Sequence, residues 1–272
     1  MNPELLEMIQ NRCRGITESH LDRDLGSAIL PNTTPVPFFG EYSRSSVVTI
    51  SLNPSSAEFP RSSSSKSSSR KTDRTLRYLD QLGLKDSLFL EHRPVEDSEN
   101  INRIFEGLVS YFKDETWNKE WFKPVETSLN IGFEASYFDP SFEIRACHLD
   151  ISPWATDSWS SEKVKPFRKR LIEENLTFFQ AFLSESQFTD VVLLGSDAAV
   201  ILENDMPNIH LSFPLDPKSQ EELGPKFGSG TISVNGCEKK NLYFISFSPS
   251  AGKNVSKFKK HHKNRFASSS RE

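Results

Sequence analysis

Four short apolar runs along the chain predict buried strands. Each run is rich in β-branched or aromatic residues and is too short to form an amphipathic helix. Each also ends at a turn signal that contains Pro or Gly. The runs cover residues 47–52, 142–151, 190–195 and 242–247.

Helical periodicity appears between these runs. The clearest example is residues 161–185, where apolar side chains recur at helical spacing and Ser160 or Ser161 is suited to cap the first turn. Asn235-Gly236 marks a hairpin before the last strand, because Asn-Gly is the strongest short signal for a hairpin turn. Further helices are predicted at residues 3–14, 72–82, 98–113 and 196–202.

Strands that alternate with helices are typical of a parallel sheet covered by helices. We therefore expect an α/β fold with three layers, α/β/α, around a central four-stranded, mostly parallel sheet. Ligands of such sheets bind at the carboxyl ends of the strands. The loops that follow the four strands are thus where we expect functional residues.

Composition narrows the class of protein. Hydrophobic residues make up 36% of the 272 residues, enough for one sizeable core, so we expect a single domain over residues 1–272. No apolar run reaches the roughly 18 residues of a membrane span, and the first residues lack the pattern of a secretory signal. The three cysteines lack metal or disulfide spacing. We expect an intracellular monomer, cytoplasmic if bacterial, with no membrane contact, metal or other cofactor.

Charge is distributed unevenly along the chain, and this distribution bears on which kind of partner the protein binds. The formal net charge is −4, yet residues 61–77 carry +5 and residues 253–272 carry +6, which leaves −15 for the remainder. The first tract contains a Ser-rich stretch, 61–70, expected to be a flexible loop, and the chain ends in a basic tail, 259–272. A third basic cluster, at 163–170, also follows a predicted strand. Basic tracts after strand ends indicate an anionic partner.

The strand-end motifs occur in an order that carries more information than each motif alone. The first strand ends in Leu52-Asn53-Pro54-Ser55, the third runs into Gly195-Ser196, and the last ends in Ser248-Pro249-Ser250. This combination resembles the uracil-DNA glycosylase superfamily, and the Asn-Pro motif resembles its mismatch-specific uracil/thymine branch. The resemblance extends over residues 45–260 through short matching stretches. The iron–sulfur branches need four cysteines and do not fit.

This resemblance implies a metal-free, monofunctional DNA glycosylase. Such an enzyme flips a base out of DNA and hydrolyses its bond to the sugar, leaving an abasic site. Asn53 matches the residue that positions the attacking water. His148 precedes Asp150 by two residues, so both side chains point to one face of a strand, and His148 is a candidate donor to the base. The alternative for His148 is a core histidine with satisfied hydrogen bonds.

The other site residues follow from the same match. Pro54, Ser55 and Phe59 fall in the loop that binds and stacks on the base. The loop that enters DNA corresponds to Ser248, Pro249, Ser250, Lys253 and Asn254, and the basic tract adds Arg70 and Lys71 as DNA contacts. The sequence offers a core role for Phe59 as an alternative, because the chain has 21 Phe.

Asp150 decides which base we expect. It stands where the family often has Asn, and an ionised carboxylate only accepts hydrogen bonds, so it does not suit uracil O4. It suits the amino group of cytosine, and this favours a cytosine-type base, for example hydroxymethylcytosine or its glucosylated form in phage DNA. In that case the protein serves defence against phages. A structural role for Asp150, as a helix cap or a partner of an arginine, is the alternative.

Other functions remain open from the sequence. Ser248 replaces the family's usual histidine, which weakens the case for strong uracil excision, although a uracil/thymine mismatch repair enzyme is the first alternative. A second alternative is an inactive nucleic-acid-binding module of the same fold. A third is an unrelated nucleotide-binding α/β enzyme.

Overall fold

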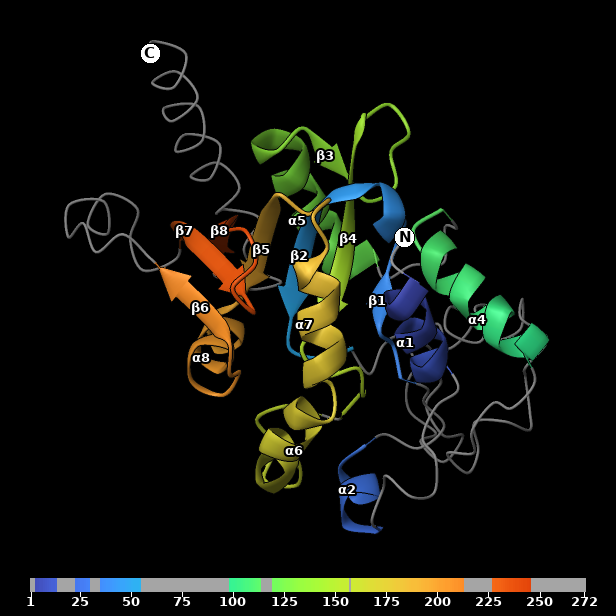
Figure 1. The fold of residues 1–272 in the computed structure, drawn as a ribbon, viewed down its shortest axis with the longest axis vertical. Coiled ribbons are helices and arrows are strands. Elements are labelled where there is room, and N and C mark those ends of the chain that lie inside the picture. The colour runs from blue at the N-terminus through green and yellow to red at the C-terminus, as the bar shows by residue number, and fades with distance from the viewer. Residues whose placement is uncertain are drawn as a thin grey trace. The chain divides into compact units, whose positions relative to one another are not determined.

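The structure is a computed structural model of the chain (Figure 1). The residues that it describes group into two compact units, which we treat separately. Unit 1 comprises those within 1–40, 52–118 and 149–182, and unit 2 comprises those within 41–51, 119–148 and 183–272. The expectation of a single domain stays a prediction. The described residues are 3–13, 23–29, 35–54, 98–113, 119–156, 158–212 and 227–245.

Unit 2 is built on three adjacent parallel strands. β2 (Ser45–Ser51) pairs with β5 (Asp190–Leu194), and β5 pairs with β8 (Lys240–Ile245). Val48 and Val191 face each other in this register, and both are fully buried. Strands that are covered on both faces need continuous apolar runs, and this is why these segments lack a polar alternation.

Further strands widen this parallel core. β7 (Phe227–Val234) pairs antiparallel with β8, and β6 (Ile209–Ser212) pairs antiparallel with β7. On the other side β4 (Ile144–Asp150) lies next to β2 and pairs in parallel with β3 (Ala135–Ser136). The last two residues of β4 belong to unit 1. The sheet is therefore mixed, with a parallel centre.

The strand count corrects the expected four-stranded sheet. Within the described ranges the sheet has eight strands, and the eighth is β1 (Phe38–Phe39) of unit 1. The four predicted strands are all present and follow one another in the order β4-β2-β5-β8. The sequence missed β1 and β3 because two residues show no periodicity, and it missed β6 because the hairpin signal covers only β7 and β8.

Helices surround these strands. In unit 2, α5 (Lys119–Gly132) packs against β3, and α8 (Ser196–Asn204) packs against β5, β6 and β8; a short 3₁₀ turn, η1 (Tyr42–Arg44), precedes β2. In unit 1, α1 (Pro3–Cys13) packs against α4 (Ser98–Ser110). The predicted helices at 3–14, 98–113 and 196–202 are confirmed, whereas 72–82 lies outside the described residues. The structure adds α2 (Arg23–Ala28) and α5.

The predicted helix at 161–185 is wrong as one element. It is divided into η3 (Lys165–Phe167), α6 (Arg168–Glu173) and α7 (Leu176–Ser184). The last two residues of α7 belong to unit 2. Pro166 has no N–H to continue a helical ladder, and Asn175 interrupts the helix because Asn favours the cap position. Ser161 does act at the first turn, where its Oγ accepts a hydrogen bond from Val164 N–H at 3.3 Å.

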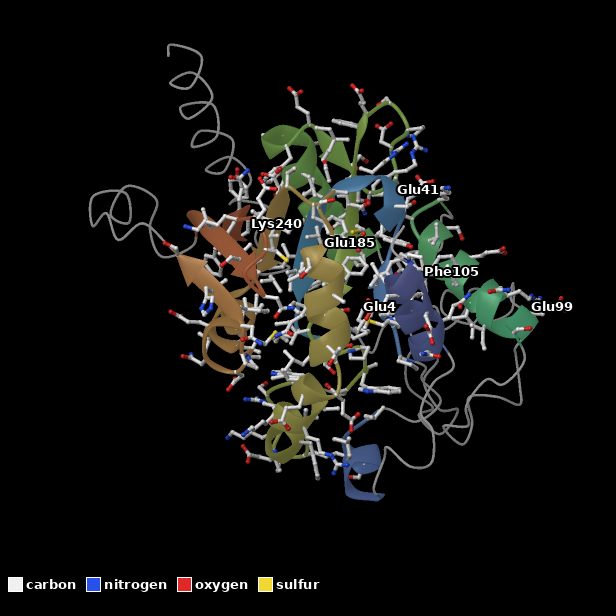
Figure 2. The ribbon with its side chains drawn as sticks, viewed as in Figure 1. Glu4, Glu41, Glu99, Phe105, Glu185 and Lys240 are labelled. Carbon is white, nitrogen blue, oxygen red and sulfur yellow. The ribbon has the colours of Figure 1, made fainter. Side chains whose placement is uncertain are left out.

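The predicted hairpin turn is confirmed. Asn235 and Gly236 have φ of 51° and 72°, the left-handed values that this turn requires, and Cys237 N–H donates to Val234 O at 2.9 Å. After the hairpin, Lys240 begins β8 with its side chain buried. Its Nζ donates to Glu185 O and Phe188 O, both at 2.7 Å, and burial lowers the pKa of this lysine. Figure 2 labels Lys240 and Glu185.

A buried carboxyl joins α5 to β3 in unit 2. Glu126 accepts hydrogen bonds from Ser136 Oγ, from Asn130 Nδ2 at 3.0 Å and from the Tyr137 backbone N–H at 2.9 Å. Burial nevertheless raises the pKa of Glu126, because desolvation of the carboxylate outweighs these hydrogen bonds. The carboxyl is therefore protonated more readily in the folded chain than in the unfolded chain.

We expect the contribution of Glu126 to stability to fall as the pH rises. A group whose folded-state pKa lies above its unfolded value stabilises the fold fully below the unfolded pKa, and this stabilisation is lost as the pH rises through the folded pKa. Urea unfolding of the wild type and of Glu126→Gln, from about pH 4 to about pH 8, measures the effect. The wild-type free energy of unfolding should decrease relative to the variant's; a constant difference would contradict the assignment.

Candidate functional site

Four of the predicted site residues lie in the described part of the chain. Asn53, Pro54 and Asp150 belong to unit 1, and His148 belongs to unit 2. The other nine lie outside the described residues, and their roles stay predictions: Ser55, Phe59, Arg70, Lys71, Ser248, Pro249, Ser250, Lys253 and Asn254.

Residues 150–156, which we call the β4 exit segment, lie in unit 1 beside Leu52, the residue that follows β2. Ser152 N–H donates to Leu52 O at 2.8 Å, and Val36 N–H donates to Pro153 O at 2.8 Å. Trp154 and Thr156 in this segment are both buried. The structure thus brings the chain that follows β2 together with the chain that follows β4, as expected for neighbouring strand ends.

Asn53 makes the closest side-chain connection to this segment. Its Nδ2 donates to Trp154 O at 3.3 Å and to Thr156 Oγ1 at 3.2 Å, and it also lies 3.2 Å from Pro54 O. Two of these three partners are carbonyl oxygens, which only accept hydrogen bonds, so the amino group of the amide must face them. The orientation of the amide is therefore fixed by its partners.

The carbonyl oxygen of Asn53 is left available by this arrangement. Within the ranges that the structure describes, no donor lies within hydrogen-bond distance of Asn53 Oδ1, and the residue is only half-buried. An amide oxygen of fixed direction can accept a hydrogen bond from a water molecule and hold it in one place. An amide is a poor base, however, so it can orient a water but contributes little to removing its proton.

Asp150 is the last residue of β4, and 2% of its surface is exposed. Its backbone carbonyl accepts a hydrogen bond from Asn175 Nδ2 at 3.4 Å, and the carbonyl of Ile151 accepts one from the same nitrogen at 2.9 Å. A carboxyl at this depth is costly unless polar groups face it. The end of β4 therefore carries a buried acidic side chain next to the buried amide of Asn175.

His148 lies in a buried chain of side-chain hydrogen bonds in unit 2. Its Nδ1 is 2.8 Å from Thr49 Oγ1, and its Nε2 is 3.3 Å from Ser51 Oγ. Thr49 Oγ1 also lies 2.5 Å from Tyr137 OH, and the Phe122 ring packs edge-on against the imidazole. Both ring nitrogens face hydroxyls, which can donate or accept, and Thr49 Oγ1 also donates to Cys147 O at 3.2 Å. This is the geometry of the core-histidine alternative.

The Ser51–His148 pair does not have the arrangement of a nucleophile and its base. The third partner is a threonine hydroxyl where a carboxylate would be needed to stabilise a charged imidazole, and Ser51 is buried. Cys147, beside His148 on β4, is also buried, and desolvation raises the pKa of its thiol. The thiol therefore stays protonated and unreactive.

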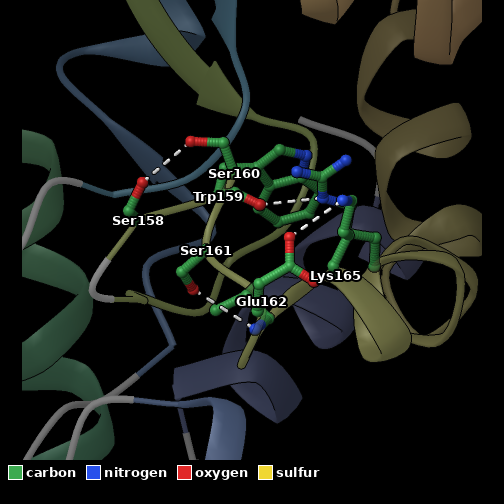
Figure 3. Close-up of polar contacts among 8 residues, drawn as sticks. Ser158, Trp159, Ser160, Ser161, Glu162 and Lys165 are labelled. Atoms are coloured by element: carbon green, nitrogen blue, oxygen red, sulfur yellow. Dashed lines mark hydrogen bonds and ion pairs between the residues drawn. The ribbon is translucent and has the colours of Figure 1, made fainter.

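An exposed basic segment follows the β4 exit segment in unit 1. Residues 163–170 contain five basic and no acidic residues. Figure 3 shows its beginning, where Lys165 Nζ lies 2.9 Å from Glu162 Oε1 and Ser158 Oγ lies 3.1 Å from Ser160 Oγ. Arg168 Nε donates to Trp159 O at 2.8 Å. The backbone contact fixes the arginine, while the lysines remain at the surface.

Sequence reasoning missed three residues that define this site: Trp154, Thr156 and Asn175. A signal existed for Asn175, because an Asn inside a predicted helix indicates a helix start. Trp154 and Thr156 gave no signal, since their roles depend on a backbone carbonyl and a hydroxyl that the fold brings to Asn53. These residues come from a loop without periodicity.

The described part of the chain has no helix long and apolar enough to cross a membrane. Within the same ranges, no three His, Cys, Asp or Glu side chains gather as a metal site would require. Comparisons of the chain with protein-family models, with curated proteins and with solved structures give no match. The resemblance to the glycosylase superfamily therefore stays a prediction, and the chain is assigned to no family.

Proposed function

We propose that the protein is a DNA glycosylase that hydrolyses the bond between deoxyribose and a pyrimidine-type base. The observation that carries this proposal is the amide of Asn53. Its amino group is held by Trp154 O and Thr156 Oγ1, and its oxygen is available at the end of a strand of a parallel sheet. The carboxyl ends of such strands are where ligands bind.

The chemistry follows from what an amide can do. Asn53 Oδ1 holds a water molecule towards the sugar carbon while the base departs with the electrons of the glycosidic bond. The hydroxyl of the water bonds to the sugar, and its proton passes to solvent or to the departing base. Because the amide is a poor base, the rate depends on orientation and on the leaving group.

Asp150 selects the base in this proposal. A carboxylate accepts a hydrogen bond from the amino group of cytosine, whereas it opposes uracil O4 with a second acceptor. We therefore propose a cytosine-type base, modified cytosines included, as the substrate. Uracil excision and binding without excision are the alternative outcomes of the experiments below.

The basic segment supports DNA as the partner. Lys169 pairs with Glu173 at 3.8 Å, and at this exposed position an ion pair contributes little. Lys169 can therefore exchange a carboxylate for a phosphate at small cost, while Arg170 pairs with Glu174 at 3.8 Å in a half-buried place. Lys163 is exposed as well, and no acidic partner is recorded for it among the described residues. The segment therefore offers several cations to a phosphate backbone.

Asn53→Ala should abolish most of the excision. Duplex oligonucleotides carrying uracil, a thymine mismatch, cytosine or hydroxymethylcytosine are incubated with excess protein, and alkali then reveals abasic sites. We expect single-turnover excision by Asn53→Ala to fall by about 10²-fold, because the water loses its orientation. Asn102→Ala, an exposed Asn on α4, is the matched control and should keep the wild-type rate. Equal loss in both variants, or no excision by the wild type, would overturn the proposal.

Asp150→Asn should change which base is removed. The amide can donate to uracil O4, so the ratio of cytosine-type to uracil excision should fall by about tenfold or more, as a discrimination of about 1–3 kcal/mol implies. Asp190→Asn, at the amino end of β5, is the control. If the ratio is the same in both variants and the wild type, Asp150 does not read the base.

Removal of two exposed lysines should reduce the salt dependence of DNA binding. For Lys163→Ala combined with Lys169→Ala, the slope of log K against log salt should decrease by about 2, because each phosphate contact contributes about 1. Binding is measured by fluorescence anisotropy with a labelled duplex at several salt concentrations. Lys123→Ala, on α5, tests whether any exposed lysine has this effect. An unchanged slope in the double variant would exclude the segment as a DNA contact.

A further inference from the structure

We propose that Asn175 is a positioning residue that fixes the end of β4 and thereby the direction in which Asp150 meets the base. The activity part of this inference rests on the proposed glycosylase function. Its structural part stands on unit 1 alone, because Asn175, Asp150 and the whole β4 exit segment belong to that unit.

The contacts of Asn175 are all directed at the β4 exit segment. The residue is fully buried, and its Nδ2 donates to Ile151 O at 2.9 Å and to Asp150 O at 3.4 Å. The carbonyls of two successive residues are thus held at the point where β4 leaves the sheet. Holding the two successive peptide groups on either side of the Ile151 Cα restricts the backbone directly after Asp150, and with it the direction of the Asp150 side chain.

Asn175 lies at the N-cap of α7, but its side chain does not cap that helix. It directly precedes α7, and its carbonyl accepts a hydrogen bond from Phe179 N–H at 2.9 Å, which is the N-cap position. An Asn at the N-cap ordinarily accepts a backbone N–H of the first turn with its side-chain oxygen. Here Asn175 Oδ1 is buried, and no donor in the described part of the chain reaches it.

This arrangement is expensive for the fold. A buried acceptor without a partner has lost its hydrogen bonds to water and gained none in the fold. The β4 exit segment, which Asn175 contacts, contains a second buried polar atom without a partner. The indole N–H of Trp154 is buried with no acceptor among the described residues. Proteins keep such local conflicts mainly at functional sites. We therefore infer that Asn is present at position 175 because of its two hydrogen bonds to the β4 exit segment.

The remaining contacts explain why Asn175 matters for Asp150 in particular. Asn53 holds the far end of the β4 exit segment through Trp154 and Thr156, and Leu52 O holds Ser152. Asn175 holds the end at Asp150 through the carbonyls of Asp150 and Ile151. A site residue displaced by about 1 Å can lose about 10²-fold in rate, so the supporting residue affects selectivity without touching the base.

Asn175→Leu tests this inference, because leucine has a similar shape and no donors. The matched control is Asn130→Leu, which removes an amide that donates to Glu126 Oε1 and to Ala135 O in unit 2. Amide hydrogen exchange of Ser152 and Trp154 is measured in both variants. We expect about tenfold faster exchange in Asn175→Leu, since local opening becomes easier, and no change in Asn130→Leu. Unchanged exchange in Asn175→Leu overturns the inference, whatever the activity.

Excision then separates positioning from mere stability. Asn175→Leu should lower the single-turnover rate and bring the ratio of cytosine-type to uracil excision at least about threefold closer to one, with an unchanged KM for DNA. Asn130→Leu should lower the midpoint of urea unfolding and leave this ratio at the wild-type value. Faster exchange with an unchanged ratio would overturn the positioning of Asp150 and leave a structural role only.

Two outcomes distinguish this inference from the proposed function. If the wild type excises no base while Asn175→Leu exchanges faster, the glycosylase proposal fails and the hold on the β4 exit segment stands. If Asn175→Leu does not fold, Asn175→Ser takes its place, because serine keeps one donor and adds no bulk. Its exchange should lie between those of the wild type and the fully opened segment, and wild-type exchange in Asn175→Ser would overturn the inference.

Discussion

The need of buried backbone carbonyls for a donor governs the candidate site. Inside a sheet, the backbone N–H groups of the neighbouring strand donate to each carbonyl. Beyond the end of the strand these donors are absent, and other groups must take their place. At the end of β4 the donors are side-chain amides: Asn175 serves Asp150 and Ile151, and Asn53 serves Trp154. In each amide the nitrogen donates to the backbone, and within the described ranges the oxygen makes no hydrogen bond to it. Asn53 is half-buried, and its oxygen is the one that the proposed chemistry uses, whereas Asn175 Oδ1 is buried without a donor among the described residues.

The parallel centre of the sheet explains why polar residues gather at strand ends. β2 and β5 are covered on both faces, so their interiors must be apolar, or polar only where side chains satisfy one another. Thr49 and His148 are the example of the second case, because the hydroxyl of Thr49 serves Tyr137 and the imidazole together. A polar network of this kind specifies the pairing of its strands. Such a network keeps polar side chains satisfied within the sheet, whereas Asn53 and Asp150 lie at or just beyond the strand ends.

The elements with long periodic patterns could be predicted from the sequence, and those set by tertiary contacts could not. The runs around Val48 and Val191 gave the correct strands, and Asn235-Gly236 gave the hairpin turn, because each has a local physical cause. The two-residue strand β3 depends on Glu126 and on the neighbouring β4, neither of which is local. For the site, Asn53 and Asp150 were found from strand ends. Their supports were not, since Thr156 Oγ1 and Asn175 Nδ2 act through contacts between segments distant in sequence.

The proposed chemistry assigns different tasks to an amide and a carboxylate, and the reverse assignment would not work. A carboxylate at position 53 would be a stronger base, but its two acceptor oxygens could not donate to Trp154 O and Thr156 Oγ1 in the way that the amino group does. An amide at position 150 could pair with either uracil or cytosine by turning over, so it would select neither by itself. In the proposed mechanism, the amide of Asn53 therefore raises the rate by orienting the water. The carboxylate of Asp150 selects the base through its charge. In both cases the proposed function depends on the β4 exit segment, which the amides of Asn53 and Asn175 hold in place.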